Sequence, residues 1–360
     1  MPAPPRNFIT PEEFSCPRPE TGGALIQLAH GSGGRLGAEL LTQLLLPAFA
    51  DPLLERLEDQ ATVDFSGGRL AFTTDSFVVD PLFFPGGDIG ELAVNGTVND
   101  LAMGGAKPLY LSVALIIEEG LPIEVLQRVA ASLAGAAKRA GVRVVTGDTK
   151  VVGRGACDKL FINTSGIGLM GPGINLSAAN LRPGDRIILS GTMADHGMAI
   201  MSCRQGLSFA APLRSDTAPL HELVALIMAR LGDGVAALRA MRDPTRGGVA
   251  ATLNELARAS GVGVVIEETE LPVAEPVRGA CEILGIDPLL VANEGKMVAV
   301  VAPEAAATVL AAMREHPLGR QAAIIGEVLA DHPGLVALRT PFGPQRIVQL
   351  PLGEQLPRIC

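Results

Sequence analysis

Apolar residues recur along the chain with two different periods, which predict a mixture of strands and helices. Residues 70–76 (LAFTTDS) and 109–117 (LYLSVALII) predict strands, and the second run is apolar enough to predict burial on both faces. Between them, residues 90–105 have helical spacing that stops at two glycines. A second helix is predicted to begin after Pro122 and to end at Gly141.

The same mixture continues to the end of the chain. Further strands are predicted at residues 142–149, 160–169, 186–192, 262–268, 297–303, 322–328 and 346–350. Helical patterning is found around residues 217–241 and from Val249 to Gly261. Because strands and helices mix in both halves rather than forming one long βαβ series, the sequence predicts an α+β fold.

Proline and glycine indicate where the chain divides. Residues 171–185 contain two prolines and few periodic apolar positions, so a domain boundary is predicted there. The two domains are then residues 21–174 and 175–345, preceded by a proline-rich extension over residues 1–20. Residues 346–360 are predicted to form a final strand and a mobile tail.

Composition excludes several classes of protein. The chain has 360 residues, of which 48% are hydrophobic, so a packed core is available. A net charge of −9 with only 3% aromatic residues argues against nucleic-acid binding and against a membrane-surface protein. Five dispersed cysteines without a CxxC pair, and an N-terminus without an apolar signal segment, predict a protein of the reducing cytoplasm.

Candidate chemistry lies where acidic or amide residues follow predicted strands or share one helix face. Taken singly, each of these segments is better explained by helix capping or turn formation than by a ligand site. Taken together, carboxylates from several elements are what Mg²⁺ and a bound polyphosphate require. The residues concerned are Asp75, Asn95, Asn99, Asp100, Gly147–Lys150 and Asp243–Gly248.

Three further features each allow two interpretations. The glycine-rich segment from His30 to Arg35 is either a phosphate-binding loop or a flexible connector. Glu294 precedes a predicted strand and is either a buried base or a solvated turn carboxylate. Cys360, the last residue, is either a carrier thiol on a proline-stiffened tail or a chance terminal cysteine.

Several of these segments also carry a family resemblance. The segments TTDSFVVDPLFFPGGDIGELA (73–93) and VTGDTKVV (145–152), with PRIC at residues 357–360, resemble the HypE family of hydrogenase-maturation carbamoyl dehydratases. This family belongs to the PurM-like ATP-binding superfamily, and the resemblance runs from His30 almost to the end of the chain. Sister families share the aspartate-bearing segments but are not known for the PRIC ending.

The resemblance implies a PurM-like fold of two domains. The sheet of the N-terminal domain would pair with its copy in a homodimer and place ATP near the interface. Asp75, Asp100 and Asp243 would be the carboxylates that bind Mg²⁺, and Asp148 would lie at the phosphates. The residues that would line the nucleotide are Asn95, Asn99, Thr149, Lys150 and Thr245.

The resemblance also implies the reaction. Cys360 would receive a carbamoyl group from a partner transferase of the HypF type, and ATP would drive its dehydration to a thiocyanate. The cyanide would pass to a HypC–HypD scaffold and become a ligand of the iron of [NiFe] hydrogenase. Glu294 is the expected base, and Lys150 would help to neutralise phosphate. The alternatives are a sister kinase or synthetase acting on a free small molecule, and a nucleotide-gated scaffold.

Overall fold

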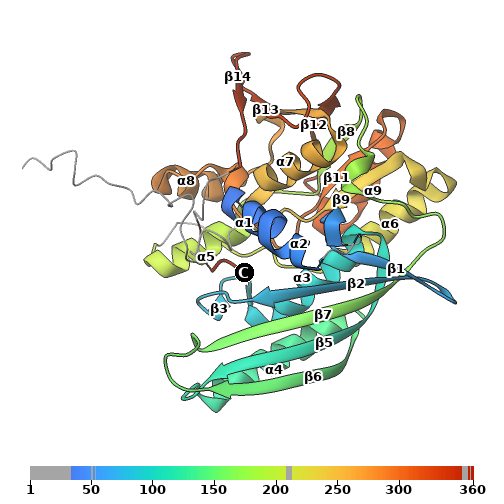
Figure 1. Cartoon of the computed structure of the whole chain (residues 1–360). Helices are drawn as coiled ribbons and strands as arrows, with labels where there is room; N and C mark the ends of the chain where they lie inside the picture. The colour runs from blue at the N-terminus through green and yellow to red at the C-terminus, as the bar shows by residue number, and fades with distance from the viewer. Residues whose placement is uncertain (1–33, 50–51, 53, 208–212, 351–355, 357) are drawn as a thin grey trace, which may run out of the picture.

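A computed structural model represents the chain, and the structure is described for residues 34–49, 52, 54–207, 213–350, 356 and 358–360. Two β-sheets organise it (Figure 1). The first sheet has five strands in the order β1-β2-β7-β5-β6, of which only β5 and β6 are parallel neighbours. Their bounds are β1 Ala61–Phe65, β2 Gly68–Phe77, β5 Ala106–Glu118, β6 Arg143–Val152 and β7 Leu160–Met170.

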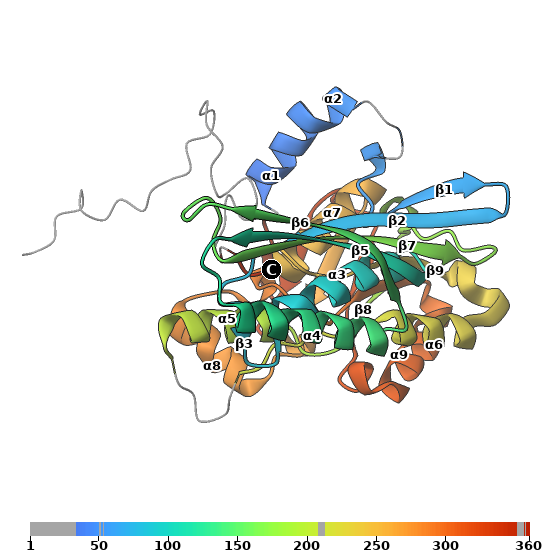
Figure 2. The same ribbon diagram turned by 90° about the horizontal axis from the view of Figure 1, so that it is seen from below.

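Two helices cover one face of the first sheet (Figure 2). Helix α3 (Ile89–Met103) begins at Asp88, whose carboxylate accepts hydrogen bonds from the next helical backbone N–H groups. Helix α4 (Ile123–Arg139) packs on α3 and buries only a stripe of its surface. Nearly every residue of α3 is buried, because this helix lies between the first sheet and the second half of the chain.

The other face of the first sheet is open. Phe72, Ile167 and Tyr110 are direct neighbours across β2, β7 and β5, and their side chains are 48%, 38% and 40% exposed. The prediction that residues 109–117 form a strand is confirmed, but the prediction that this strand is buried on both faces is wrong for the single chain. Its residues alternate between the helix-covered face and the open face.

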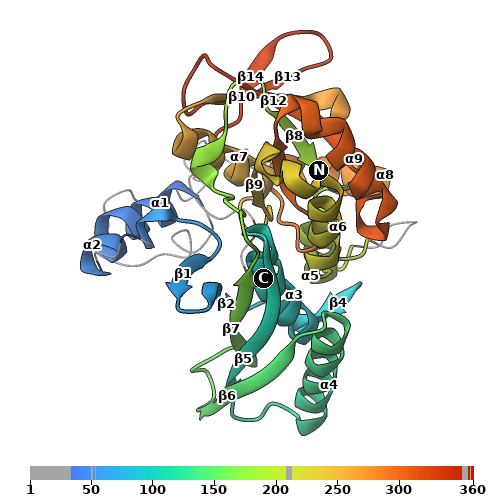
Figure 3. The same cartoon turned by 90° about the vertical axis from the view of Figure 1, so that its right-hand side faces the viewer.

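The second sheet has seven strands in the order β14-β13-β10-β12-β8-β11-β9 (Figure 3). Helix α7 (Gly248–Ser260) packs on one face, and α6 (His221–Leu231) with α9 (Ala306–Glu315) packs on the other. The strand bounds are β8 Arg186–Leu189, β9 Leu238–Arg242, β10 Gly263–Glu267, β11 Val298–Val301, β12 Ala323–Leu329, β13 Val336–Arg339 and β14 Gln345–Ile347.

The helical patterning around residues 217–241 is only partly confirmed. Helix α6 ends at Leu231, and Gly232 has a positive φ of 51°, which favours glycine there. The chain then makes a short 3₁₀ turn and enters β9. The sequence analysis also missed β13, a strand of only four residues.

A third core joins the two halves of the chain. It contains α5 (Asp195–Gln205), α8 (Glu275–Leu284), residues of the first sheet, and Leu356 and Ile359 of the C-terminal tail. Smaller elements are α1 Arg35–Leu40, a π-helical turn Leu41–Leu45, α2 Leu46–Phe49, β3 Phe83–Phe84 and β4 Gly87–Asp88. The α+β class is therefore confirmed, and the end of the tail lies between α5 and the β3 segment (Figure 1).

Candidate active site

Three acidic side chains from different elements lie on the helix-covered side of the first sheet. Asp75 belongs to β2, Asp100 to α3, and Asp243 follows β9. The Thr73 hydroxyl lies 2.9 Å from Asp100 Oδ2 and 2.9 Å from the backbone oxygen of Asp59. A hydroxyl has one proton to donate, so a protonated Asp100 would complete this pair by donating to Thr73.

The electrostatic surroundings of these carboxylates favour protonation or a bound cation. Burial, together with the charges of Asp243, Asp75 and Asp59, raises the pKa of Asp100 well above its ordinary value. Burial raises the pKa of Asp243 to about 6. A hard cation with phosphate oxygens would relieve this repulsion.

The predicted Mg²⁺ carboxylates do not form a complete metal site by themselves. In the described part of the chain, no group of three or more His, Cys, Asp or Glu side chains could hold a metal ion by itself. Asp75, Asp100 and Asp243 interact through their charges without forming such a group. Mg²⁺ in nucleotide sites is commonly bound by one or two carboxylates together with phosphates and water, and the cluster fits that kind of site.

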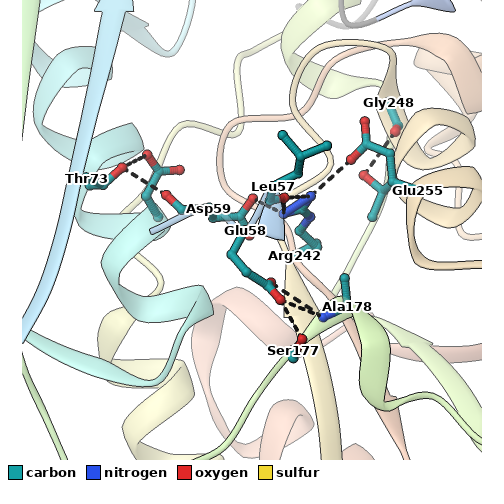
Figure 4. Close-up of polar contacts among 11 residues, drawn as sticks. Leu57, Glu58, Asp59, Thr73, Ser177, Ala178, Arg242, Gly248 and Glu255 are labelled. Carbon is teal, nitrogen blue, oxygen red and sulfur yellow. Dashed lines mark hydrogen bonds and ion pairs between the residues drawn. The ribbon is translucent and has the colours of Figure 1, made fainter. Parts of the chain in front are cut away.

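Asp59 is a further buried carboxylate beside this cluster, and the sequence analysis missed it. Arg242 donates to Asp59 Oδ1 at 2.7 Å and to Glu255 Oε2 at 3.2 Å (Figure 4). Burial raises the pKa of Asp59 well above its usual range despite the opposing charge of Arg242. The neighbouring Glu58 accepts hydrogen bonds from Ser177 and the Ala178 backbone, which ties the start of β1 to the second half of the chain.

Glu294 lies in the loop before β11 and is almost completely buried. Its side chain is 2% exposed, and its Oε1 atom is one of the few buried polar atoms without a hydrogen-bond partner in the described residues. Burial and the charges of Asp75, Asp243 and Asp216 raise its pKa well above the usual range, while Arg246 opposes the shift. A carboxylate with a raised pKa and an unused oxygen is suited to accept a proton.

A short segment from Ser215 to Leu220 fixes the loop that carries Glu294. The Glu294 backbone N–H donates to Asp216 Oδ1 at 3.1 Å, and Asp216 forms a buried ion pair of 3.1 Å with Lys296. Burial is the largest single influence and raises the pKa of Asp216, but nearby positive charge, chiefly Lys296, together with the hydrogen bonds from Lys296 and the Glu294 N–H outweighs it, and the pKa is lowered. Asp216 is therefore ionised and holds the backbone of the loop.

The two asparagines of α3 support this segment. Asn99 donates to the Ala218 and Glu294 carbonyl oxygens and accepts from the Leu220 N–H, so its amide is used within the protein. Asn95 donates to the Thr217 hydroxyl at 3.1 Å. Both residues are 1% exposed, and their predicted role at the nucleotide stays a prediction.

The end of the C-terminal tail packs against the same region. The Val78 N–H donates to the Cys360 carbonyl oxygen at 3.0 Å, and Ile359 is buried. Arg204 of α5 donates to the Arg358 carbonyl oxygen, and Arg358 forms an ion pair with Asp158. These contacts place Cys360 half-buried at the third core.

Arg246 connects the tail electrostatically with the acidic cluster. The negative charge at Cys360 is the largest cause that raises the pKa of Arg246, followed among the raising charges by Asp75, Glu294 and Asp100. The thiol-bearing residue, the candidate base and the carboxylates therefore share one cation. None of these contacts is local in sequence.

Two protein-family models and several proteins of known function match this chain. The model of AIR synthase related protein, N-terminal domain, matches residues 57–170, and that of AIR synthase related protein, C-terminal domain, matches residues 182–337. Carbamoyl dehydratase HypE of Bradyrhizobium diazoefficiens is 56% identical over 335 residues, which cover 93% of this chain and 96% of that protein. The chain belongs to the HypE family. Carbamoyl dehydratase HypE of Escherichia coli K12 is 50% identical, with 93% of this chain and 99% of that protein covered.

Solved HypE structures share the fold. The HypE–HypF complex matches with a TM-score of 0.82 and 51% identity, covering 87% of this chain and 99% of that chain. HypE in complex with ATP matches with a TM-score of 0.77 and 49% identity, covering 93% and 100%. The PurM-like fold and the membership of the HypE family that the sequence predicts are thus confirmed. In the described residues, no helix has the length and apolar character needed to cross a membrane.

Three other residues that were predicted to bind the nucleotide do not lie at the acidic cluster within one chain. Asp148, Thr149 and Lys150 lie on the exposed edge strand β6, where Asp148 and Lys150 form an ion pair of 3.2 Å. Asp148 pairs in register with Ala114 on β5, so it projects from the open face, opposite to Asp75. Three strand spacings separate β2 from β6, or about 14 Å.

The remaining predicted segments give a mixed result. Thr245 is partly buried in the turn between Asp243 and α7, next to the acidic cluster. Residues 30–33 of the glycine-rich segment lie outside the described residues, and Arg35 forms an ion pair of 3.3 Å with Glu39 at the start of α1.

The sequence analysis missed four residues that the structure brings to the site. These are Asp59, His196, Asp216 and Arg246. Two signals in the sequence could have indicated them. Asp59 lies two residues before β1, Asp243 directly follows β9, and Arg246 belongs to the same segment as Asp243.

Proposed function

We propose that this chain dehydrates a carbamoyl group on its own Cys360 to a thiocyanate, with ATP as co-substrate, in hydrogenase maturation. One observation carries the proposal: the tail is docked so that Cys360 interacts with Arg246, which also interacts with Asp75 and Glu294. This arrangement brings a carrier thiol, a phosphate-binding environment and a base to one place. The names of the relatives, carbamoyl dehydratase HypE, support the same activity.

The reaction requires a good leaving group and a base. The carbonyl oxygen of S–C(=O)–NH₂ attacks the γ-phosphorus of ATP, the bond to the bridging oxygen breaks, and ADP leaves. The nitrogen then loses its protons in turn, its electron pair forms C≡N, and the C–O bond breaks to release phosphate. Glu294 is the residue suited to accept these protons, because it is buried, has a raised pKa and has an unused oxygen.

The acidic cluster would hold the metal with the nucleotide. We infer that one or two of Asp75, Asp100 and Asp243 bind Mg²⁺ whose remaining ligands are phosphate oxygens and water. Bound Mg²⁺ would neutralise charge that develops on the phosphoryl group. Arg246 adds positive charge beside the tail. Asn95 and Asn99 then contribute by holding the loop of Glu294.

The open face of the first sheet supports a homodimer. Phe72, Ile167 and Tyr110 form an exposed apolar row, and a contiguous patch of this kind marks an interface. A second copy packed on this face would bring Asp148 and Lys150 to the interface, because β6 belongs to the same sheet. We propose that Lys150 serves the site of the partner copy, since within one chain it lies on the far edge of the sheet from Asp75.

Other partners follow from the need to load and unload the tail. A transferase of the HypF type would carbamoylate Cys360, and the crystal structure of a HypE–HypF complex, which this chain resembles, supports this pairing. A HypC–HypD scaffold would accept the cyanide, which requires Cys360 to leave its docked position. The dispersed cysteines favour the reducing cytoplasm as the site of this exchange.

Mass spectrometry of the C-terminal peptide tests the proposed activity. The protein is incubated with the transferase, carbamoyl phosphate and Mg-ATP, and a cyano adduct one water lighter than the carbamoyl adduct is expected on Cys360. Cys360→Ala must carry neither adduct, and Cys203→Ser, which changes an exposed cysteine of α5, must behave as the unchanged protein. A carbamoyl adduct that ATP never converts would refute the dehydratase. Turnover of a free substrate after deletion of Cys360 would support a sister kinase.

A mixed dimer tests whether Lys150 acts across the interface. Cys360→Ala and Lys150→Ala chains are inactive separately under the proposal. When the two are mixed and exchanged, the Cys360 of one chain meets the Lys150 of the other, so activity is expected to return in the mixed dimer. If Lys150 acts within its own chain, no site contains both residues and the mixture stays inactive.

A further inference from the structure

His196 is buried at the start of α5 and contacts the tail one residue before the thiol. Its Nε2 atom lies 2.7 Å from the Ile359 carbonyl oxygen, and its Nδ1 atom lies 2.8 Å from Ser215 Oγ. A carbonyl oxygen only accepts, so Nε2 must carry the proton, and neutral Nδ1 accepts from the Ser215 hydroxyl. Burial lowers the pKa of His196, which agrees with a neutral ring.

The helix that carries His196 is fixed to the loop that carries Glu294. The Ala194 N–H donates to Asn293 Oδ1 at 2.7 Å, and the Gly197 N–H donates to the Ala292 carbonyl oxygen at 3.1 Å. His196 and Glu294 therefore belong to one hydrogen-bonded unit.

The residues around His196 are tightly packed. A Cβ atom on Gly197 would lie 2.4 Å from Val291 and 3.3 Å from Leu356 of the tail. Phe84 contacts the His196 ring edge-to-face, with 5.5 Å between the ring centres. The ring is thus held on several sides while its Nε2 proton points to the tail.

We propose that His196 is a positioning residue that clamps the Ile359 carbonyl and thereby places the modified Cys360 against Glu294. This proposal rests on the proposed function. The His196 hydrogen bond is made one residue from Cys360, whereas Arg204 holds the Arg358 carbonyl two residues away. The Val78 N–H holds the carbonyl oxygen of Cys360 itself, His196 fixes the preceding peptide group through its side chain, and the Arg204 contact holds the tail one residue further back.

Two rates measured on the full chain test the clamp. The first is alkylation of Cys360 by a maleimide, read on the C-terminal peptide, and the second is single-turnover cyanation of protein already carbamoylated on Cys360. His196→Ala is expected to raise the first and to lower the second, each about tenfold, the effect of one lost hydrogen bond. His196→Gln has an N–H at the same reach as Nε2, so both rates should return most of the way. His221→Ala, at the start of α6, is the matched control and should change neither rate.

The outcomes separate the clamp from a general role in folding. Unchanged alkylation in His196→Ala, or no recovery in His196→Gln, would overturn the proposal. Thermal unfolding checks whether His196→Ala folds. If it does not, Ser215→Ala takes its place, because it removes the hydroxyl that orients the ring, and it must shift both rates in the same directions. Unchanged rates in Ser215→Ala would then overturn the clamp. If the unchanged protein forms no cyano adduct at all, the proposed function fails, and the alkylation rates alone still decide whether His196 holds the tail.

Discussion

Glu294→Gln is expected to stabilise the ligand-free protein while it removes the dehydration step. Glu294 is 2% exposed, its Oε1 has no hydrogen-bond partner in the described residues, and three neighbouring aspartates raise its pKa. Glutamine keeps the shape of the side chain but has no charge to bury. A carboxylate that is buried without a partner lowers the stability of the folded protein, although the reaction needs it as a base. Replacing it should therefore raise the stability and lower the activity.

The magnitude follows from burial. A buried group without a partner costs about 1–3 kcal/mol and more when it is charged, so removing the charge is expected to stabilise the variant by at least about 1 kcal/mol, which for a chain of this size corresponds to a rise in Tm of about 1–4 °C. The pKa of Glu294 is raised in the folded state, so the stability that its proton provides is fully present below about pH 4.5 and is lost as the pH rises through the raised pKa. Glutamine does not titrate. The gain in Tm should therefore be small at pH 5 and larger at pH 8.

Scanning calorimetry of both proteins without nucleotide at pH 5 and pH 8 measures this difference. Single-turnover cyanation of the carbamoylated proteins measures the activity, and loss of the general base should slow it by a factor of about 10²–10⁴. Carbamoylation by the transferase should be unchanged. A variant that is less stable at pH 8, or whose Tm difference is the same at both pH values, would refute the assignment of an unpaired, titrating carboxylate.

Three more predictions test the metal, the interface and the tail. EDTA should stop cyanation of protein already carbamoylated, and excess Mg²⁺ should restore it; cyanation that persists in EDTA contradicts a metal role. Tyr110→Glu should give a monomer by light scattering, whereas Ile283→Glu on α8, also an exposed apolar position, should leave the dimer intact. Gly197→Ala places a Cβ 2.4 Å from Val291 and should lower Tm by several degrees and raise the alkylation rate of Cys360. Gly279→Ala meets open space and should not lower Tm, and equal effects of both would refute the packing argument.

The sequence was most informative where the pattern is local. Helix α3 could be predicted because residues 90–105 have helical spacing and end at two glycines, and β2 and α7 follow from similar short patterns. Three carboxylates could be expected to lie close together, because each follows or belongs to a strand or helix with a local pattern of this kind. These are Asp75, Asp100 and Asp243. The four-residue β13 could not be predicted, because its residues alternate between buried and partly exposed positions and lack the continuous apolar run of the equally short β8 and β11.

The contacts that complete the site depend on tertiary structure. His196 reaches Ile359 across 163 residues, and Asp216 reaches Lys296 across 80 residues. No spacing rule connects residues so far apart. For the same reason the sequence could place Asn99 on a helix face but could not show that its amide holds the Glu294 loop.

One wrong prediction becomes informative when the whole assembly is considered. Residues 109–117 are apolar at nearly every position, which predicts burial on both faces, yet Tyr110 and Ile116 are 40% and 41% exposed in the single chain. In a strand with one face in water, apolar residues normally alternate with polar residues. The nearly continuous apolar run is therefore better explained by the proposed second copy covering the open face than by the single chain. The same copy would bring the edge strand with Lys150 toward a partner site, so the apolar run and the isolated lysine have one physical explanation.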